Sequence, residues 1–548
     1  MVASVFWAMQ TYLIDRLRDA ASRLYPGIAL PDIQIEKPRQ PEHGDAATNI
    51  ALMLTKLVGK PPRNVAQELV DAMDVDAAHI TAMEIAGPGF INFRFSPTWL
   101  HQQLHHILKN ESFGKSARLD GKTYMVEFVS ANPTGPLTVG HGRNAVLGDT
   151  VARLYEWAGA EVTREYYFNN AGRQMRVLGA SVHARYAQEL GLDVPLPEGG
   201  YEGEYIADIA HNLRTREGDG LVDDPTNPKF KEAAEHLIFE DIKRTLDRLQ
   251  IRMDTFFNED DLYKDGSIER VLAELRAKDL AYDQDGAVWF RTTAFGKEKD
   301  TVLVKSTGEP TYRLPDIAYH VKKLERGFDV CVDVFGADHI ATYPDVLSAI
   351  DTLGFDAKRI DVLIYQFVTI VKDGVPYKMS TRKANFVTLD ELMDEVGADV
   401  TRFFFLMRSP GTHLEFDIAQ AKEAGEKNPV FYLQYAHARI HSILRKLELA
   451  PAAEVSLDQL THPSELKLLK ALADFPDAIL SAAMSKEPHR LINYLNEAAV
   501  DFHKFYHDCR ILGEEAGLAA ARTQLLLGTA RVMKNGLTVL GISAPEQM

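Results

Sequence analysis

Apolar residues recur along the first part of the chain with the period of a helix. Apolar side chains lie three to four positions apart in three stretches, at residues 11–25, 46–57 and 65–73. This spacing predicts three amphipathic helices. Residues 90–95 alternate apolar and polar side chains from Ile91 onward, which predicts a half-buried strand. We therefore expect residues 1–118 to form an N-terminal α/β domain.

A different pattern begins near Lys122. It predicts a strand, a loop, a helix and a strand, at residues 124–129, 131–136, 145–158 and 161–168. The loop contains Pro and Gly, and Gly159 follows the helix. A strand–helix–strand unit is typical of a doubly wound parallel sheet, so we expect a Rossmann-like α/β fold in residues 119–390. Ligands of such sheets bind at strand C-terminal ends, beside helix N-termini.

The remainder of the chain is mixed at first and then helical. Short strand-like pieces occur at residues 302–304, 330–335 and 362–371. After Thr388 the pattern is almost wholly helical, and residues 428–449 and 465–480 are strongly periodic. We expect a connecting helical segment and then an all-α helical bundle, at residues 391–425 and 426–548.

Composition and charge narrow the class of protein. The chain has 548 residues, of which 46% are hydrophobic and 25% charged, which is ordinary globular composition. No apolar run reaches the roughly 18 residues of a membrane helix, and the first twenty residues do not resemble a signal peptide. We therefore expect a cytoplasmic protein that does not enter a membrane. Two cysteines exclude a disulfide scaffold and a zinc site built from cysteines.

The net charge of −17 argues against indiscriminate binding of nucleic acid. The charge is unevenly distributed, because residues 421–548 carry 14 Lys and Arg against 15 Asp and Glu. The near-neutral tail would therefore meet a polyanion with less repulsion than the rest of the chain. A helical domain with no such role is equally compatible with this charge.

The loop between the first predicted strand and helix of the βαβ unit is a candidate phosphate site. Gly140 allows a phosphate to approach the backbone, and His141 stands at the start of the helix. The free N–H groups and the dipole of a helix N-terminus favour an anion there. An imidazole can also donate to a phosphate oxygen as negative charge develops. The alternative is a loop with a capping histidine.

A second candidate is the basic loop at residues 376–385, which follows the predicted strand 362–371. Lys378, Arg382 and Lys383 could hold a triphosphate without a cluster of metal-binding carboxylates. The alternative is a solvated basic turn.

Together, the two loops resemble the HIGH and KMSKS motifs of class I aminoacyl-tRNA synthetases. The longer context is similar to arginyl-tRNA synthetases at residues 128–136, 164–172, 310–320 and 336–339. Residues 41–49 and 87–92 resemble the N-terminal tRNA-contacting domain of that family. Residues 397–402 and 434–439 resemble the start of its helical anticodon-binding domain.

The resemblance implies an arginine–tRNA ligase. Its reaction uses ATP to activate L-arginine to arginyl-adenylate and then transfers the arginyl group to the 3′ end of tRNA(Arg). The residues that it implies for ATP are Thr138, Gly140, His141, Lys378, Met379, Ser380 and Arg382. Mg²⁺ would accompany ATP without a dedicated protein site. The chain departs from the usual motifs at Thr138, where the family has histidine, and at Thr381, where many class I enzymes have lysine.

Selection of arginine requires carboxylates, because a guanidinium is planar, always charged and has five donors. Tyr312 and Asp316 are four positions apart and share a face if residues 312–322 are helical. The resemblance implies that this pair holds the guanidinium. Without it, a surface aromatic and a carboxylate at a helix start are the simpler interpretation. The other candidates for arginine binding are Asn132, Glu259 and Asp338.

Tyr432, Tyr435 and Arg439 are candidates for tRNA binding in the helical tail, where aromatic rings could stack on bases. We expect a monomer. Three alternatives stay open: an inactive tRNA-binding paralogue, a different class I synthetase, and a small-molecule nucleotidyltransferase.

Overall fold

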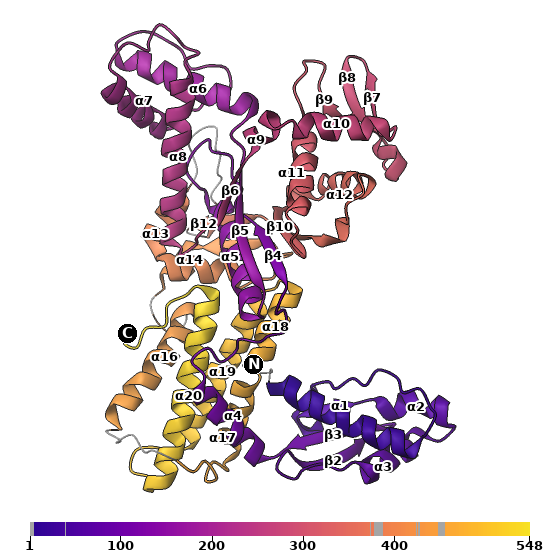
Figure 1. Cartoon of the computed structure of the whole chain (residues 1–548). Helices are drawn as coiled ribbons and strands as arrows, with labels where there is room; N and C mark the ends of the chain where they lie inside the picture. The colour runs from indigo at the N-terminus through magenta and orange to yellow at the C-terminus, as the bar shows by residue number, and fades with distance from the viewer. Residues whose placement is uncertain are drawn as a thin grey trace.

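The computed structural model describes residues 5–38, 40–372, 374–376, 387–423, 425, 428–447 and 455–548 (Figure 1). Four of the residues expected to bind ATP lie outside the described residues: Lys378, Met379, Ser380 and Arg382.

The N-terminal unit is a three-stranded antiparallel sheet covered by helices. Its elements are α1 (Val5–Leu24), β1 (Ala46–Thr48), α2 (Ile50–Val58), α3 (Pro62–Ala72), β2 (Ile80–Ala86) and β3 (Phe90–Phe95), and the strand order is β1-β3-β2. The predicted helices and the strand at 90–95 are confirmed. The prediction that a helix begins at Ala46 was wrong, because residues 46–48 pair with β3 before α2 begins.

A five-stranded parallel sheet forms the centre of the molecule. In the order β11-β10-β4-β5-β6, its strands are Ile360–Tyr365, Val330–Gly336, Thr123–Glu127, Glu161–Phe168 and Thr255–Asn258. Every neighbouring pair runs parallel, which confirms the doubly wound fold. The strand order reverses between β4 and β10, so the ligand crevice is expected at their C-terminal ends.

The piece predicted as one strand at residues 362–371 is two strands in different sheets. β11 ends at Tyr365, and β12 (Val368–Lys372) pairs with β13 (Val375–Pro376) and with β14 (Leu414–Asp417). Between them, the N–H of Gln366 bonds to the carbonyl of Pro410, so the chain leaves the central sheet at that point.

Helices join and extend the central sheet. α5 (Val139–Trp157) connects β4 to β5, and two insertions project from the C-terminal side of the sheet (Figure 1). One insertion contains α6 (Gly172–Glu189), α7 (Glu204–Glu217) and α8 (Pro228–Arg248). The other contains α9 (Glu259–Lys264), α10 (Ser267–Ala277), β7 (Ala281–Gln284), β8 (Ala287–Phe290), β9 (Thr301–Val304) and α11 (Arg313–Glu325). α12 (Tyr343–Thr352) then connects β10 to β11.

The C-terminal part is a bundle of helices, as predicted, apart from β14. The helices are α13 (Leu389–Val396), α14 (Ala398–Leu406), α15 (Ile418–Lys422), α16 (Pro429–Lys446), α17 (Pro463–Ala473), α18 (Phe475–Ser485), α19 (His489–Asp508) and α20 (Ala516–Leu540). The periodic stretch 465–480 spans two helices, because Pro476 starts a new one in its first turn. α4 (Pro97–Lys109) packs against α17 and α20. None of the helices in the described part of the chain is long and apolar enough to cross a membrane.

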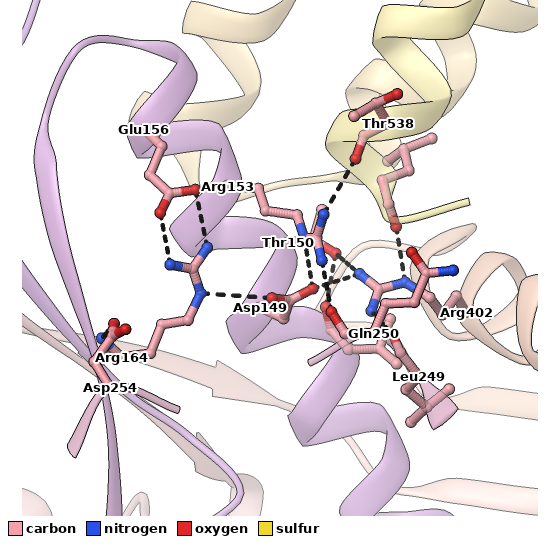
Figure 2. A network of polar contacts seen from close by, with 12 residues as sticks. Asp149, Thr150, Arg153, Glu156, Arg164, Leu249, Gln250, Asp254, Arg402 and Thr538 are labelled. Carbon is pink, nitrogen blue, oxygen red and sulfur yellow. Dashed lines mark hydrogen bonds and ion pairs between the residues drawn. The ribbon is translucent and has the colours of Figure 1, made fainter. Parts of the chain in front are cut away.

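A buried arginine joins the bundle to the central sheet domain (Figure 2). The guanidinium of Arg402 on α14 donates to the carboxylate of Asp149 on α5 at 2.7 Å. It also donates to the carbonyls of Leu249 at 2.7 Å and Leu540 at 2.9 Å, which follow α8 and end α20. Gly541 then turns the chain at φ +69°, where a Cβ would lie 2.4 Å from the Arg402 guanidinium. Only glycine at position 541 therefore allows the end of α20 to approach Arg402 this closely.

Replacing Gly541 with alanine is expected to destabilise the chain more than the same change at Gly27. Gly27 also has a positive φ, +86°, but a Cβ there would meet nothing within 4 Å. Gly27→Ala therefore measures backbone strain alone, about 1–2 kcal/mol, whereas Gly541→Ala must also displace a buried ion pair. Denaturant unfolding followed by circular dichroism compares them, and equal losses would contradict the packing at Arg402.

Candidate active site

A cavity of about 1050 Å³ opens at the C-terminal ends of β4 and β10, where the sheet order reverses. Seven of the predicted site residues line it: Asn132, Thr138, Gly140, His141, Tyr312, Asp316 and Asp338. They come from the loop after β4, the first turn of α5, the start of α11 and the turn after β10. Residues as far apart in sequence as Asn132 and Asp338 are thus brought to one site.

The loop after β4 is held in an uncommon backbone conformation. Val129 and Ser130 have φ values of +66° and +39°. Positive φ is costly for a β-branched residue and persists only where the surroundings enforce it. Asn144 of α5 does so, because its side-chain oxygen accepts the N–H of Val129 at 2.6 Å and its amide donates to the carbonyl of Val334 at 2.8 Å. Asn144 therefore joins both strands at the crevice, a role that sequence reasoning missed.

His141 is oriented by the N-terminal cap of α5. The backbone N–H of Thr138 donates to Nδ1 of His141 at 3.1 Å, which assigns the ring proton to Nε2. Burial lowers the pKa of His141 to about 4, so the ring is neutral at neutral pH. His141 can therefore offer one N–H donor to a phosphate oxygen without carrying a charge. Thr138 itself occupies the N-cap position, with an extended backbone.

The residues that follow the basic loop 376–385 contact the loop that leads into α5. Thr388 forms an isolated antiparallel bridge with Thr138, and the N–H of Leu389 donates to the carbonyl of Leu137 at 2.8 Å. Thr388 also caps α13. Residues 387–389 therefore lie directly against the loop that leads into α5.

The floor of the cavity is a buried cluster of charges that the sequence pattern did not single out. Glu127 and Asp333 are register partners on β4 and β10, and both are buried. Lys323 of α11 is fully buried and forms ion pairs with both carboxylates, at 2.5 Å to Asp333. Burial opposes its charge, but the two carboxylates outweigh that cost and raise the pKa of Lys323. His320 completes the cluster, with Nε2 2.9 Å from the Asp333 carboxylate.

Tyr312 and Asp316 lie where the helical prediction placed them. α11 begins at Arg313, so Tyr312 is its N-cap and Asp316 is in its first turn. Tyr312 is 70% exposed at the mouth of the cavity. Burial raises the pKa of Asp316 to about 6, so its carboxyl is ionised at neutral pH but loses its charge in mild acid. Asp338 and Asn132 are exposed on the cavity wall.

Glu259 lies behind the cavity wall. It is buried and accepts the hydroxyl of Tyr167 at 2.7 Å, and Tyr167 is the residue that lines the cavity. Burial raises the pKa of Glu259 to about 7. In this position, Glu259 can orient the Tyr167 side chain, which lines the cavity. Direct contact of its carboxylate with arginine stays a prediction.

The three candidates for tRNA binding share one surface of the helical bundle. Tyr432 and Arg439 of α16 line a cavity of about 370 Å³ together with His503, Tyr506 and His507. The Arg439 guanidinium lies over the rings of Tyr506 and Tyr435, at 5.1 Å and 6.0 Å from their centroids. This surface combines a cation with stacked aromatic rings, the groups on which bases and phosphates bind.

Comparison with known protein families identifies three domains. Residues 103–403 match the model described as the catalytic domain of class I (R) tRNA synthetases. Residues 11–95 match the arginyl tRNA synthetase N terminal domain, and residues 433–548 match the DALR anticodon binding domain. The fold, the cavity at the sheet crevice and these matches define a class I aminoacyl-tRNA synthetase.

Individual relatives specify the amino acid. An arginine–tRNA ligase of Salinibacter ruber is 53% identical, covering 97% of this chain and all of that protein. One of Desulfotalea psychrophila is 49% identical and covers 94% of each chain. The structure of the Thermus thermophilus arginyl-tRNA synthetase shares the fold, with a TM-score of 0.75 at 24% identity over 98% of this chain. The chain belongs to the arginine–tRNA ligase family, which excludes the nucleotidyltransferase and other-synthetase alternatives.

The affinity for arginine is expected to fall as the pH drops from 7.5 to 5. Protonation of Asp316, whose pKa is about 6, removes a charge that would face the guanidinium. Below that pKa, the loss approaches tenfold per pH unit. Asp316→Asn should weaken arginine binding at neutral pH and remove this step, with ATP binding unchanged. Equilibrium titration of arginine across the pH range measures it.

Glu259→Gln is the matched control, because glutamine still offers an oxygen to the Tyr167 hydroxyl. This variant should keep the step that belongs to Asp316. If the pH step survives in Asp316→Asn and disappears in Glu259→Gln, the pH dependence belongs to Glu259 and the assignment to Asp316 is wrong.

Proposed function

We propose that the chain ligates L-arginine to tRNA(Arg) in two steps within the cavity at β4 and β10. A carboxylate oxygen of arginine attacks the α-phosphorus of ATP, and pyrophosphate leaves. The 3′-terminal ribose hydroxyl of the tRNA then attacks the carbonyl carbon of arginyl-adenylate, and AMP leaves. The observation that carries this proposal is an acidic cavity that directly adjoins the N-terminus of α5.

The two ends of the cavity suit the two substrates. Asp316 and Glu127 offer carboxylates to the guanidinium, and Tyr312 lies at the mouth above them. At the other end, the N–H groups of the first turn of α5 and Nε2–H of His141 can bind the phosphates. Asn132 lies on the loop between these ends and is assigned to the amino-acid end of arginine. In this arrangement, the arginine carboxylate points towards the α-phosphorus.

The remaining motif residues are assigned to the leaving group. Lys378 and Arg382 would neutralise the pyrophosphate that departs, with Met379 and Ser380 in the same loop. The support is that residues 387–389, just after this loop, bond to the first motif. We assign Mg²⁺ to the ATP itself. Among the described residues, no group of three His, Cys, Asp or Glu side chains is placed to hold a metal ion.

The setting of the reaction follows from the family. We propose that the chain works in the cytoplasm as a monomer, with residues 1–118 and 426–548 contacting the tRNA and residues 119–390 performing the chemistry. The segment 391–425 would connect the catalytic part to the bundle. The surface around Arg439 is the assigned contact for anticodon bases.

Pyrophosphate exchange into ATP tests the activity. Exchange should require arginine among the twenty amino acids and should need tRNA to be present, as in the family. His141→Ala removes the Nε2–H donor and should lower the rate about 10²–10³-fold. Exchange with a different amino acid would contradict the specificity, and no exchange with arginine and tRNA would favour the inactive paralogue.

Arg439→Ala should weaken tRNA binding without changing the affinity for arginine or ATP. The variant removes a cation and one face of a stacking surface, worth about 1–3 kcal/mol per base. It should also lower the salt dependence of binding by about one unit. Arg490→Ala is the control. Arg490 lies at the start of α19, at the opposite end of this helix from His503 and Tyr506, and it pairs with Glu487. Filter binding at several salt concentrations gives both values, and equal losses in the two variants would reject the assigned surface.

A further inference from the structure

Two arginines in the described part of the chain are fully buried, and they differ in how their charge is compensated. Arg402 forms an ion pair with Asp149, which Figure 2 shows within its network. Arg143, in the second turn of α5, has no carboxylate of the described residues within ion-pair distance. A buried charge without a counter-charge is costly, so Arg143 requires an explanation.

Among the residues that the structure describes, the guanidinium of Arg143 contacts only neutral acceptors. Its terminal nitrogens donate to the backbone carbonyls of Gln366 at 2.5 Å, Thr412 at 3.0 Å and Ser409 at 3.2 Å. Its Nε is buried and has no hydrogen-bond partner. Burial lowers the pKa of Arg143 to about 10, which leaves it charged at neutral pH. The side chain therefore fixes two loops against α5, and no carboxylate of the described part of the chain compensates its positive charge.

This charge lies beside the phosphate end of the cavity. Arg143 is flanked on α5 by His141 and Asn144, which both line the cavity. Its acceptor Gln366 lies between Tyr365 and Phe367, which also line the cavity. A cation is unfavourable at a helix N-terminus, because the helix dipole is positive at the same end. Arg143 and the dipole therefore add to one positive potential, and an anion in the cavity would relieve both.

We propose that Arg143 is a positioning residue for the phosphates of ATP, whose negative charge is the missing counter-charge of the buried guanidinium. The inference rests on the proposed function, which places these phosphates at the first turn of α5. Arg143 acts on them through the electrostatic field and through the three carbonyls that fix the cavity wall. A unit charge on the order of 10 Å from an anion, at an effective dielectric constant of about 20, changes affinity roughly tenfold.

The ratio of adenosine Kd to ATP Kd isolates this effect, because adenosine carries no phosphate. Arg143→Gln keeps an amide donor for the carbonyls and removes the charge, so the ratio should fall about tenfold while adenosine affinity changes little. Arg143→Lys keeps the charge, so the ratio should stay within about twofold of the original chain. Calorimetric titration of the full-length chain measures both affinities.

Arg402→Gln is the matched control, since it also removes a fully buried arginine but one that already has a carboxylate partner. Its ratio should equal that of the original chain. A purely structural role of Arg143 predicts parallel losses of adenosine and ATP binding, and that result would overturn the inference. So would a ratio that falls as far in Arg143→Lys as in Arg143→Gln.

If Arg143→Gln does not fold, Arg143→Lys still tests the inference. A tenfold fall in the ratio of adenosine Kd to ATP Kd in Arg143→Lys would contradict the role of the charge. Failure of the proposed function is recognised separately. An unmodified chain that shows neither pyrophosphate exchange nor a preference for ATP over adenosine would overturn the proposed function and this inference together. Normal exchange with unaltered ratios in every variant would overturn the inference alone.

Discussion

One buried lysine makes the site possible. Glu127 and Asp333 stand opposite each other on adjacent parallel strands, where two carboxylates would repel strongly in a low-dielectric interior. Lys323 reaches between them from α11 and compensates the pair. It also attaches α11 to β4 and β10, and Tyr312 and Asp316 are carried at the start of that helix. The position of these two candidate arginine-binding residues therefore depends on this ion cluster at the sheet crevice.

The two ends of the cavity differ in the sign of their charge. Its floor and one wall carry Glu127, Asp333, Asp316 and Asp338 against the single buried charge of Lys323. The other end carries the dipole of α5, the neutral donor His141 and the uncompensated charge of Arg143. A cationic side chain and a polyphosphate would be drawn to opposite ends. Under the proposed function, such a field would orient both substrates before any contact specific to the transition state is made.

Local pattern predicted those parts of the site that lie within one element. The strand–loop–helix unit placed His141 at a helix start, and four-residue spacing placed Tyr312 and Asp316 on one helix. Lys323, Glu127 and Asp333 could not be found in this way, because their pairing depends on strand register between residues about 200 positions apart. Glu259 was assigned by its charge alone, and only the fold shows Tyr167 between it and the cavity.

Boundaries between adjacent elements were the other feature that the sequence pattern did not predict. The largely apolar stretch at 362–371 does not reveal that the chain changes sheet at Gln366, which is set by a bond to distant Pro410. The helical C-terminal part was easier to predict, because helical period is a local property, but the strand β14 and the new helix start at Pro476 were missed.

The proposed recognition of arginine depends on the attraction between its positive charge and ionised carboxylates. Citrulline tests this most directly, because it replaces the guanidinium with a neutral urea of nearly the same shape. At neutral pH, calorimetric titration should show arginine binding more tightly than citrulline by about a hundredfold or more. Equal affinities for the two compounds would show that the cavity reads shape rather than charge, and would contradict the assignment of its acidic floor.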